Sequence, residues 1–277
     1  MRLSSTRLSD PDRASPEAAG GTTRPVGSRG VSQNAEHLEP QFRSDVTVEL
    51  VRAAASDRDV LYAARVSTQG EQTLESAQSD AEASARDRGL INYLMRDRHG
   101  SPFEHNSMTF YVQAPIFVFR EFQRHRIASY NEESGRYREL RPVFYTPAPE
   151  RNLVQEGKPG KYLFVPGSAE QHELVDREIR ESSIRAYESY QRMLAAGIAR
   201  EVSRAVLPLN IYSSMYVTMN ARALMNFLSL RTKREDSRFP SFPQREIEMC
   251  AEKMEAFWRE LMPLTAETFD ENGRVAP

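Results

Sequence analysis

Residues 123–137, which read QRHRIASYNEESGRY, constrain this chain more than any other stretch. Between Arg120 and Arg141 there are six arginines, four glutamates and one histidine. A core helix or strand needs a regular apolar period, and only Ile127 and Ala128 are apolar at the centre of this stretch. Arginine in such number favours forked recognition of phosphate or carboxylate groups. The simpler alternative is a charged surface loop whose ions pair with one another. In both cases the sequence predicts an irregular loop.

The composition excludes several classes of protein. The chain has 277 residues, with 37 basic against 39 acidic side chains and a net charge of -2, which argues against general nucleic-acid binding. No apolar run approaches the length of a membrane span. The single cysteine, Cys250, excludes an intrachain disulfide and fits a reducing cytoplasm. It shares an apolar helix face with Ile247, Met254 and Phe257, which predicts a buried structural thiol.

The first part of the chain differs in composition from the rest. Residues 1–42 contain four Pro, four Gly and six Ser, and no aromatic residue before Phe42. Such a segment buries too little apolar area to offset its ordering entropy, so we expect a disordered N-terminal tail. It also lacks the apolar stretch of a signal peptide. Residues 43–277 should form a single domain.

Helices dominate the predicted elements of that domain. Apolar periods and end signals predict helices over 57–65, 80–98, 115–123, 169–196, 199–206, 220–230 and 244–261. Alternating patterns predict strands over 46–51, 107–113 and 214–218. The strands do not alternate regularly with the helices, so the expected class is α+β with a small, mostly antiparallel sheet. No G-x-G-x-x-G follows a strand, which argues against a Rossmann-type flavin site.

The residues from Arg120 to Arg141 are called the arginine-rich segment below. The order of residues in this segment indicates one class of enzyme. The pattern R-H-R-x-x-S-x-N-E-x-S-x-R-Y resembles the signature of the flavin-dependent thymidylate synthases. The matching positions are Arg124, His125, Arg126, Ser129, Asn131, Glu132, Ser134, Arg136 and Tyr137. The resemblance extends from about Ala63 to Arg231, and more weakly to the last predicted helix. It implies that family's α+β fold, and a homotetramer whose flavin and nucleotide sites are built from several subunits.

The implied reaction is the reductive methylation of deoxyuridine monophosphate (dUMP) to dTMP. The resemblance implies FAD as redox cofactor, NADPH as reductant and 5,10-methylenetetrahydrofolate as carbon donor, and no metal. A nucleotide phosphate needs forked, hydroxyl and backbone donors close together, and Ser134-Gly135-Arg136 supplies all three. From the sequence alone, Arg204 is as well explained by a surface arginine with a buried aliphatic stem as by a phosphate ligand. The implied dUMP ligands are Glu121, Phe122, Gln123, Arg124, Glu132, Glu133, Ser134, Gly135, Arg136, Arg204 and Arg231.

The implied FAD ligands come from separate parts of the chain. They are Ser101, Arg124, His125, Arg126, Glu132, Asn220, Ala221, Arg222 and Asn226. From its position alone, Asn220 is predicted as an ordinary helix N-cap. His99 follows a predicted helix, where a cation favours the helix dipole. The resemblance makes His99 a candidate for folate placement.

Arg231 is the implied catalytic residue. A guanidinium keeps its proton at neutral pH, so it cannot act as a base. It can stabilise the uracil ring as an anion at N3 or as an enolate, which makes carbon five more nucleophilic. Residues 232–243 follow directly and include two prolines. Compared with the shorter family pattern they read as an inserted loop, which would affect folate or NADPH access.

The single cysteine and the arginine cluster each suggest another function. A cysteine-dependent thymidylate synthase needs an activated thiolate in a polar site, and the apolar setting expected for Cys250 argues against it. A nucleotide- or RNA-binding module could use the arginine cluster without catalysis, but the near-neutral charge gives it no basic stripe. A flavin absorbance spectrum would distinguish a flavin-dependent thymidylate synthase from both alternatives.

Overall fold

A four-stranded antiparallel sheet organises the structure. The computed structural model describes residues 39–73, 85–158 and 161–277. The strands run in the order β2 (Thr47–Ala54), β3 (Ser107–Pro115), β8 (Tyr212–Met219) and β4 (Ser129–Glu132). Every neighbouring pair is antiparallel. Side chains on β3 and β8 alternate between buried and more exposed positions, so one face of the sheet is apolar.

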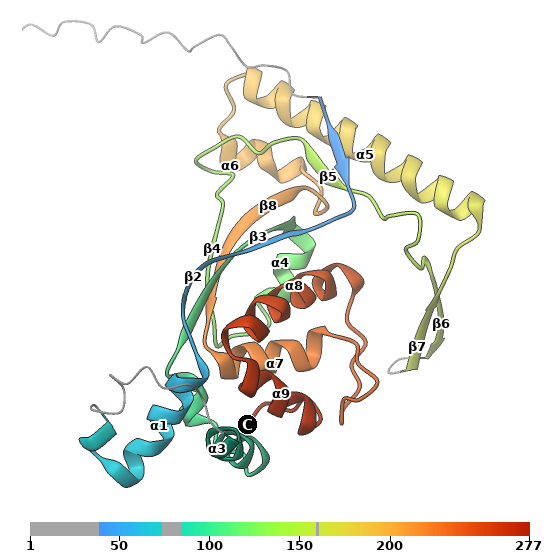
Figure 1. Ribbon diagram of the computed structural model, residues 1–277. Helices are drawn as coiled ribbons and strands as arrows, with labels where there is room; N and C mark the ends of the chain where they lie inside the picture. Colours follow the sequence, from blue (N-terminus) through green and yellow to red (C-terminus); the bar gives the residue numbers. More distant parts are fainter. Residues whose placement is uncertain (1–38, 74–84, 159–160) are drawn as a thin grey trace, which may run out of the picture. The chain divides into compact units, whose positions relative to one another are not determined.

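The remaining elements are mostly helices (Figure 1). The helices are α1 (Asp57–Gln69), α3 (Ala85–Arg96), α4 (Ile116–Phe122), α5 (Ala169–Ala195), α6 (Arg200–Ser203), α7 (Ala221–Arg231), α8 (Arg245–Leu261) and α9 (Pro263–Glu271), with 3-10 turns η1 (Ser101–Glu104) and η2 (Arg204–Val206). A parallel pair joins β1 (Gln41–Arg43) to β5 (Val143–Tyr145), and a hairpin joins β6 (Val154–Lys158) to β7 (Lys161–Val165). The α+β class, with a small antiparallel sheet and no Rossmann unit, is therefore confirmed.

The main core lies between the apolar face of the sheet and the helices α4, α7 and α8 (Figure 1). The helical period of α8 buries Ile247, Cys250, Met254 and Trp258 completely. Each large apolar side chain contributes about 1.5–3 kcal/mol by leaving water. A second, smaller core joins Phe144 of β5 to residues of α5.

Several elements depart from the sequence predictions. Gln41 and Phe42 were expected in the tail but form β1, because they pair with β5 and the Phe42 ring packs 5.9 Å from that of Phe144. Residues 1–38 of the expected tail lie outside the described residues, as does the start of the helix predicted over 80–98. The arginine-rich segment is not all loop, since its residues Ser129–Glu132 form edge strand β4 against β8. The predicted strands and the other helices are present with shifted ends.

Candidate active site

Two helix ends bring the central residues together. Helix α4 ends at Phe122, and α7 ends at Arg231. The rings of Phe122 and Phe227 stack with centroids 5.0 Å apart, which fixes one helix against the other. Arg231 Nη1 donates to Glu121 Oε2 at 2.7 Å, and Arg231 Nε donates to His125 Nε2 at 3.0 Å. The arginine implied as catalytic is thus held by a carboxylate and an imidazole from the arginine-rich segment.

The electrostatics of this cluster follow from burial. Desolvation, together with the charge of Arg231, lowers the pKa of His125 to about 4. The imidazole is therefore neutral near pH 7, as its role as acceptor from Arg231 requires. Burial raises the pKa of Glu121, Arg231 opposes that rise, and Glu246 adds to it. Within the described chain, Glu121 Oε1 is buried and has no hydrogen-bond partner.

A tight turn follows β4. The Ser134 carbonyl accepts from the backbone nitrogens of Tyr137 and Arg138, at 3.0 and 3.2 Å. The Ser134 hydroxyl accepts from the Arg136 backbone nitrogen at 3.3 Å. A side chain at Gly135 would meet Arg204 Cδ at 3.3 Å, so the turn lies directly against Arg204. The structure therefore brings these predicted phosphate ligands together.

The arginines of the site fall into two groups. Arg124, Arg126 and Arg204 are exposed, and none has an ion pair or hydrogen bond from its side chain to another described residue. Arg136, by contrast, pairs with Glu201 at 3.1 Å on the surface. Unpaired, exposed guanidiniums suit phosphate groups, because they lose no internal partner when an anion binds.

The two acidic residues of β4 and the following turn differ in their partners. Glu133 pairs with Arg138 at 3.0 Å and accepts from the Ser214 hydroxyl at 3.2 Å. Burial raises the pKa of Glu132, while the charges of Arg120 and Arg204 oppose the rise. Gln123 is exposed and Phe122 is buried in the main core. Phe122 therefore shapes the site by packing.

The other predicted flavin residues lie at the opposite end of α7. Asn220 Oδ1 accepts from the Ala223 backbone nitrogen at 2.9 Å, which confirms the predicted N-cap. The Ala221 nitrogen donates to Asn106 Oδ1 at 2.7 Å, and Asn226 Nδ2 donates to the Arg222 carbonyl at 3.1 Å. The Arg222 guanidinium pairs with Glu104.

This second group sits beside a tight chain crossing. A side chain at Gly100 would meet the guanidinium of Arg222 at 2.5 Å, so Arg222 lies directly over this glycine. Ser101 is exposed at the start of η1, and the exposed His99 ring stacks 5.5 Å from Tyr93. Arg222 and Arg231 are nine positions apart in α7, a rise of about 14 Å. One chain therefore does not bring all the predicted flavin residues to one place.

Tyr130 is a site residue that the sequence reasoning missed. Its hydroxyl lies 2.7 Å from the carbonyl oxygens of both Phe122 and His125, and bridges them as a donor. Burial raises its pKa to about 12, so the phenol keeps its proton. It thereby ties β4 to the end of α4. The sequence does show an aromatic residue inside the arginine-rich segment. Because that segment was predicted to be a loop, no packing partner could be assigned to the residue.

Some chemistries find no support in the described ranges. Cys250 is completely buried, and desolvation raises the pKa of its thiol to about 12. Residues 39–73, 85–158 and 161–277 contain no cluster of three or more His, Cys, Asp or Glu side chains that could hold a metal ion. None of the helices in these ranges is long and apolar enough to cross a membrane.

Comparisons with known proteins agree on one family. The family model described as thymidylate synthase complementing protein matches residues 49–264. A flavin-dependent thymidylate synthase from Streptomyces avermitilis is 67% identical over 244 residues, covering 88% of this chain and 98% of the relative. One from Tropheryma whipplei is 60% identical over 240 residues, covering 87% of this chain and 98% of the relative.

A solved structure matches the fold as well. The UMP/dUMP methylase PolB from Streptomyces cacaoi, bound with 5-Br dUMP, superposes with a TM-score of 0.80 at 56% sequence identity. The match covers 86% of this chain and 100% of that chain. The residues matched by the family model, 49–264, include the helices α4 and α7 and the arginine-rich segment.

Proposed function

This chain belongs to the family of flavin-dependent thymidylate synthases, and we propose from that premise that it methylates dUMP to dTMP. The single observation that carries the proposal is the placement of Arg231. Its guanidinium lies at the C-terminal end of α7, beside a neutral imidazole and a carboxylate. Two solved structures of one relative, PolB from Streptomyces cacaoi, carry 5-Br UMP and 5-Br dUMP, which are uracil nucleotides.

Arg231 is proposed to stabilise negative charge on the uracil ring. A fixed cation about 4 Å from a developing anion contributes roughly 4 kcal/mol at the effective dielectric of a partly buried site. The neutral His125 adds no competing positive charge. Glu121 holds the guanidinium in place before the nucleotide arrives. The ring anion would then share Arg231 with this carboxylate.

The nucleotide phosphate is proposed to bind at the turn after β4. Ser134, Gly135 and Arg204 lie together there, and Arg204 has no ion-pair partner among the residues described. Arg136 would exchange its surface pair with Glu201 for the phosphate. Ser134 acts as a ligand, because its hydroxyl contacts the Arg136 backbone nitrogen and, in the described ranges, no histidine or lysine that could activate it.

The residues present fit a flavin. The exposed guanidiniums of Arg124 and Arg126 lack side-chain partners in the parts of the chain that the structure describes, so they can bind a pyrophosphate. Ser101, Glu132, Asn220, Ala221, Arg222 and Asn226, with His125, complete the proposed FAD set. When bound, FAD supplies the redox chemistry that the protein side chains lack. We assign NADPH as the reductant and methylenetetrahydrofolate as the carbon donor, with His99 as a folate contact and residues 232–243 beside their route.

A homotetramer with shared sites is proposed on two grounds. The proposed flavin residues lie at both ends of α7, so a site assembled from two chains can use both ends. Large apolar side chains are also exposed near the arginine-rich segment, with exposed fractions of 75% for Ile127, 80% for Tyr137 and 56% for Val202. Such side chains mark an interaction surface when they gather. A cytoplasmic location stays a prediction that rests on the single cysteine.

Product formation tests the proposed function. The purified protein should show a flavin absorbance spectrum and form dTMP when given dUMP, methylenetetrahydrofolate, FAD and NADPH. Omitting each component in turn assigns its role, and UMP in place of dUMP measures the preference for the sugar. A colourless protein that binds uracil nucleotides or RNA without turnover would instead favour the binding module.

A further inference from the structure

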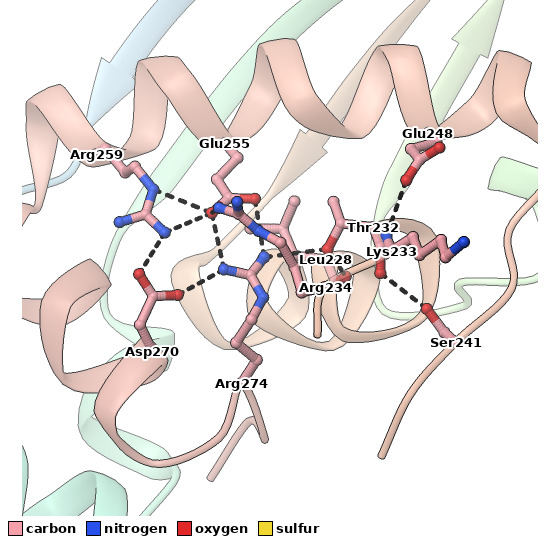
Figure 2. Close-up of polar contacts among 10 residues, drawn as sticks. All are labelled: Leu228, Thr232, Lys233, Arg234, Ser241, Glu248, Glu255, Arg259, Asp270 and Arg274. Carbon is pink, nitrogen blue, oxygen red and sulfur yellow. Dashed lines mark hydrogen bonds and ion pairs between the residues drawn. The ribbon is translucent and has the colours of Figure 1, made fainter. Parts of the chain in front are cut away.

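The residue after Arg231 belongs to a buried polar network (Figure 2). Thr232 is 4% exposed, and its hydroxyl donates to the Leu228 carbonyl at 2.7 Å. The same hydroxyl accepts from Arg274 Nη2 at 3.1 Å. The Thr232 backbone nitrogen also donates to Leu228, at 3.0 Å. Thr232 therefore closes the last turn of α7, where carbonyl groups otherwise lack partners.

Arg274 is the centre of this network. Its side chain is completely buried and forms a two-pronged pair with Glu255 of α8, at 2.9 and 2.8 Å. It also pairs with Asp270, as Figure 2 shows. Arg274 has a φ of 55°, in the left-handed region that costs a non-glycine residue energy. Surrounding contacts must therefore hold this residue where it is.

The turn that contains Gly273 and Arg274, after α9, also contacts the loop that follows Arg231. The Arg238 backbone nitrogen donates to the Gly273 carbonyl at 3.0 Å. A side chain at Gly273 would come within 2.9 Å of Arg238 Cβ, so the two segments pack closely. The Ser241 hydroxyl donates to the Thr232 carbonyl at 2.8 Å. Residues 232–243 are thus fastened at Thr232 and again at Arg238.

We propose that Arg274, held by Glu255, is a positioning residue that sets the direction of Arg231 through Thr232. The inference rests on the proposed function, because it concerns the residue proposed to stabilise the uracil anion. The guanidinium of Arg274 touches neither substrate nor cofactor in this scheme. It fixes the Thr232 hydroxyl, the hydroxyl fixes the last turn of α7, and that turn aims the Arg231 side chain at Glu121 and His125. A small displacement of a catalytic group lowers the rate steeply.

Removing either partner of the buried Arg274–Glu255 pair would unbalance a charge and obscure the result. Thr232→Val is the cleaner change, since it removes the hydroxyl, keeps the shape and leaves every charge paired. Thr268→Val is the matched control. Thr268 is also completely buried and donates to a backbone carbonyl of its own helix, Thr265 O at 3.1 Å, but it lies in α9. Thr232→Ser restores the hydroxyl and serves as the rescue variant.

The measurements are kcat and KM for dUMP, the affinity for FAD, and the rate of flavin reduction by NADPH in the absence of dUMP. Thr232→Val should lower kcat about tenfold, because the misplaced cation stabilises the transition state less. Its FAD affinity and flavin reduction should stay within about twofold of wild type, since neither needs the aim of Arg231. Thr232→Ser should recover the lost kcat. Thr268→Val should lose comparable stability and keep kcat.

A double-mutant cycle then tests the role of Arg274. Arg274→Lys keeps the charge beside Glu255 but loses the fork that reaches Thr232. If Arg274 acts through Thr232, adding Arg274→Lys to Thr232→Val should change kcat little further. Unchanged kcat in Thr232→Val, an equal loss in Thr268→Val, or additive effects in the cycle would each overturn the inference. Wild-type enzyme that forms no dTMP would instead contradict the proposed function.

Discussion

At the scale of single residues, burial decides which groups of the site carry charge. Arg231 keeps its proton under all ordinary conditions, so its surroundings must supply the selectivity. His125 is kept neutral by desolvation and by Arg231 itself. Glu121 has a raised pKa even though it pairs with Arg231, because burial outweighs the pairing. The cluster therefore contains one permanent cation and two neighbours whose pKa values the protein has shifted.

The neutral state of His125 predicts a particular pH dependence of stability. An unfolded histidine binds a proton below about pH 6.5, but folded His125 does so only near pH 4. Between these values the unfolded chain holds more protons, so the contribution of His125 to the free energy of unfolding rises with pH and is complete above about 6.5. Denaturation of wild type and His125→Gln across this range should give a stability difference that shrinks as the pH falls. A difference that is constant with pH would contradict the shift.

Cys250 predicts a change in stability without a change in chemistry. Its thiol is completely buried and has a pKa of about 12, so no thiolate is present at neutral pH. Cys250→Ala should cost roughly 1 kcal/mol of stability and leave dTMP formation nearly intact well below the melting temperature. Met254→Ala, on the same buried face, should cost more, roughly 2–5 kcal/mol, and confirms that the stability assay responds. Folded, flavin-loaded but inactive Cys250→Ala would require a role for the thiol.

At the scale of elements, distant helix ends are joined by single side chains. Asp57, at the start of α1, accepts from the backbone nitrogens of Leu264 and Thr265 at 2.9 and 2.8 Å. It also accepts from the Thr265 hydroxyl at 2.6 Å. A carboxylate from α1 therefore caps the N-terminus of α9. Asp57 does not cap its own helix, because Ser56 precedes α1 as the N-cap.

This long-range cap gives a prediction for Asp57→Ala. The change leaves one buried and one partly buried backbone donor unpaired, so it should lower stability by about 2–3 kcal/mol. Asp59 is the matched control, because among the described residues its carboxylate accepts only from the nitrogen and hydroxyl of nearby Ser56. Asp59→Ala should cost about 1 kcal/mol or less. Thermal unfolding of the two variants checks the order, and equal losses would show that the contact with α9 contributes little.

The sequence predicted those elements whose signals are local. Helix α7 was recognised from its N-cap Asn220 and its apolar period, and α8 from a period that runs its full length. Strand β4 was missed because its partner is β8, and its own residues are too polar to indicate a strand. The polar cluster around Arg274 was missed for a similar reason. Its members are far apart in the chain, and a buried arginine has no local signature.

The predicted site residues follow the same division. The family resemblance indicated Arg231 and Ser134, but it could not indicate that Glu121 pairs with Arg231. Nor could it indicate that the predicted flavin residues divide between the two ends of α7. Each of these facts depends on packing between segments, which only the folded chain supplies.

At the scale of the whole molecule, the described residues, which begin at Glu39, belong to one compact unit. This unit contains the sheet, both cores and every residue assigned here to the site. It begins with β1, whose Phe42 packs against Phe144 and lies 4.5 Å from the guanidinium of Arg180. The start of this unit therefore contributes to the second core.

Two shortened proteins test that boundary. A protein that begins at Glu39 should keep its flavin, its stability and its activity, because every described contact is retained. A protein that begins at Ser44 loses β1 and the buried part of Phe42, and should be less stable by roughly 2–4 kcal/mol. Chemical denaturation and dTMP formation measure both. Equal stability of the two proteins would show that β1 adds nothing to the fold.

The central claim is that Arg231 activates the uracil ring in a flavin-dependent methylation. The most direct measurement is the single-turnover rate of dTMP formation by flavin-loaded Arg231→Ala, compared with wild type and with Arg185→Ala, which removes an exposed arginine from α5. We predict that Arg231→Ala loses at least about 100-fold in this rate, the usual cost of removing one group that stabilises an anionic transition state. Arg185→Ala should match wild type. Folded, flavin-loaded Arg231→Ala that forms dTMP at the wild-type rate would contradict the account.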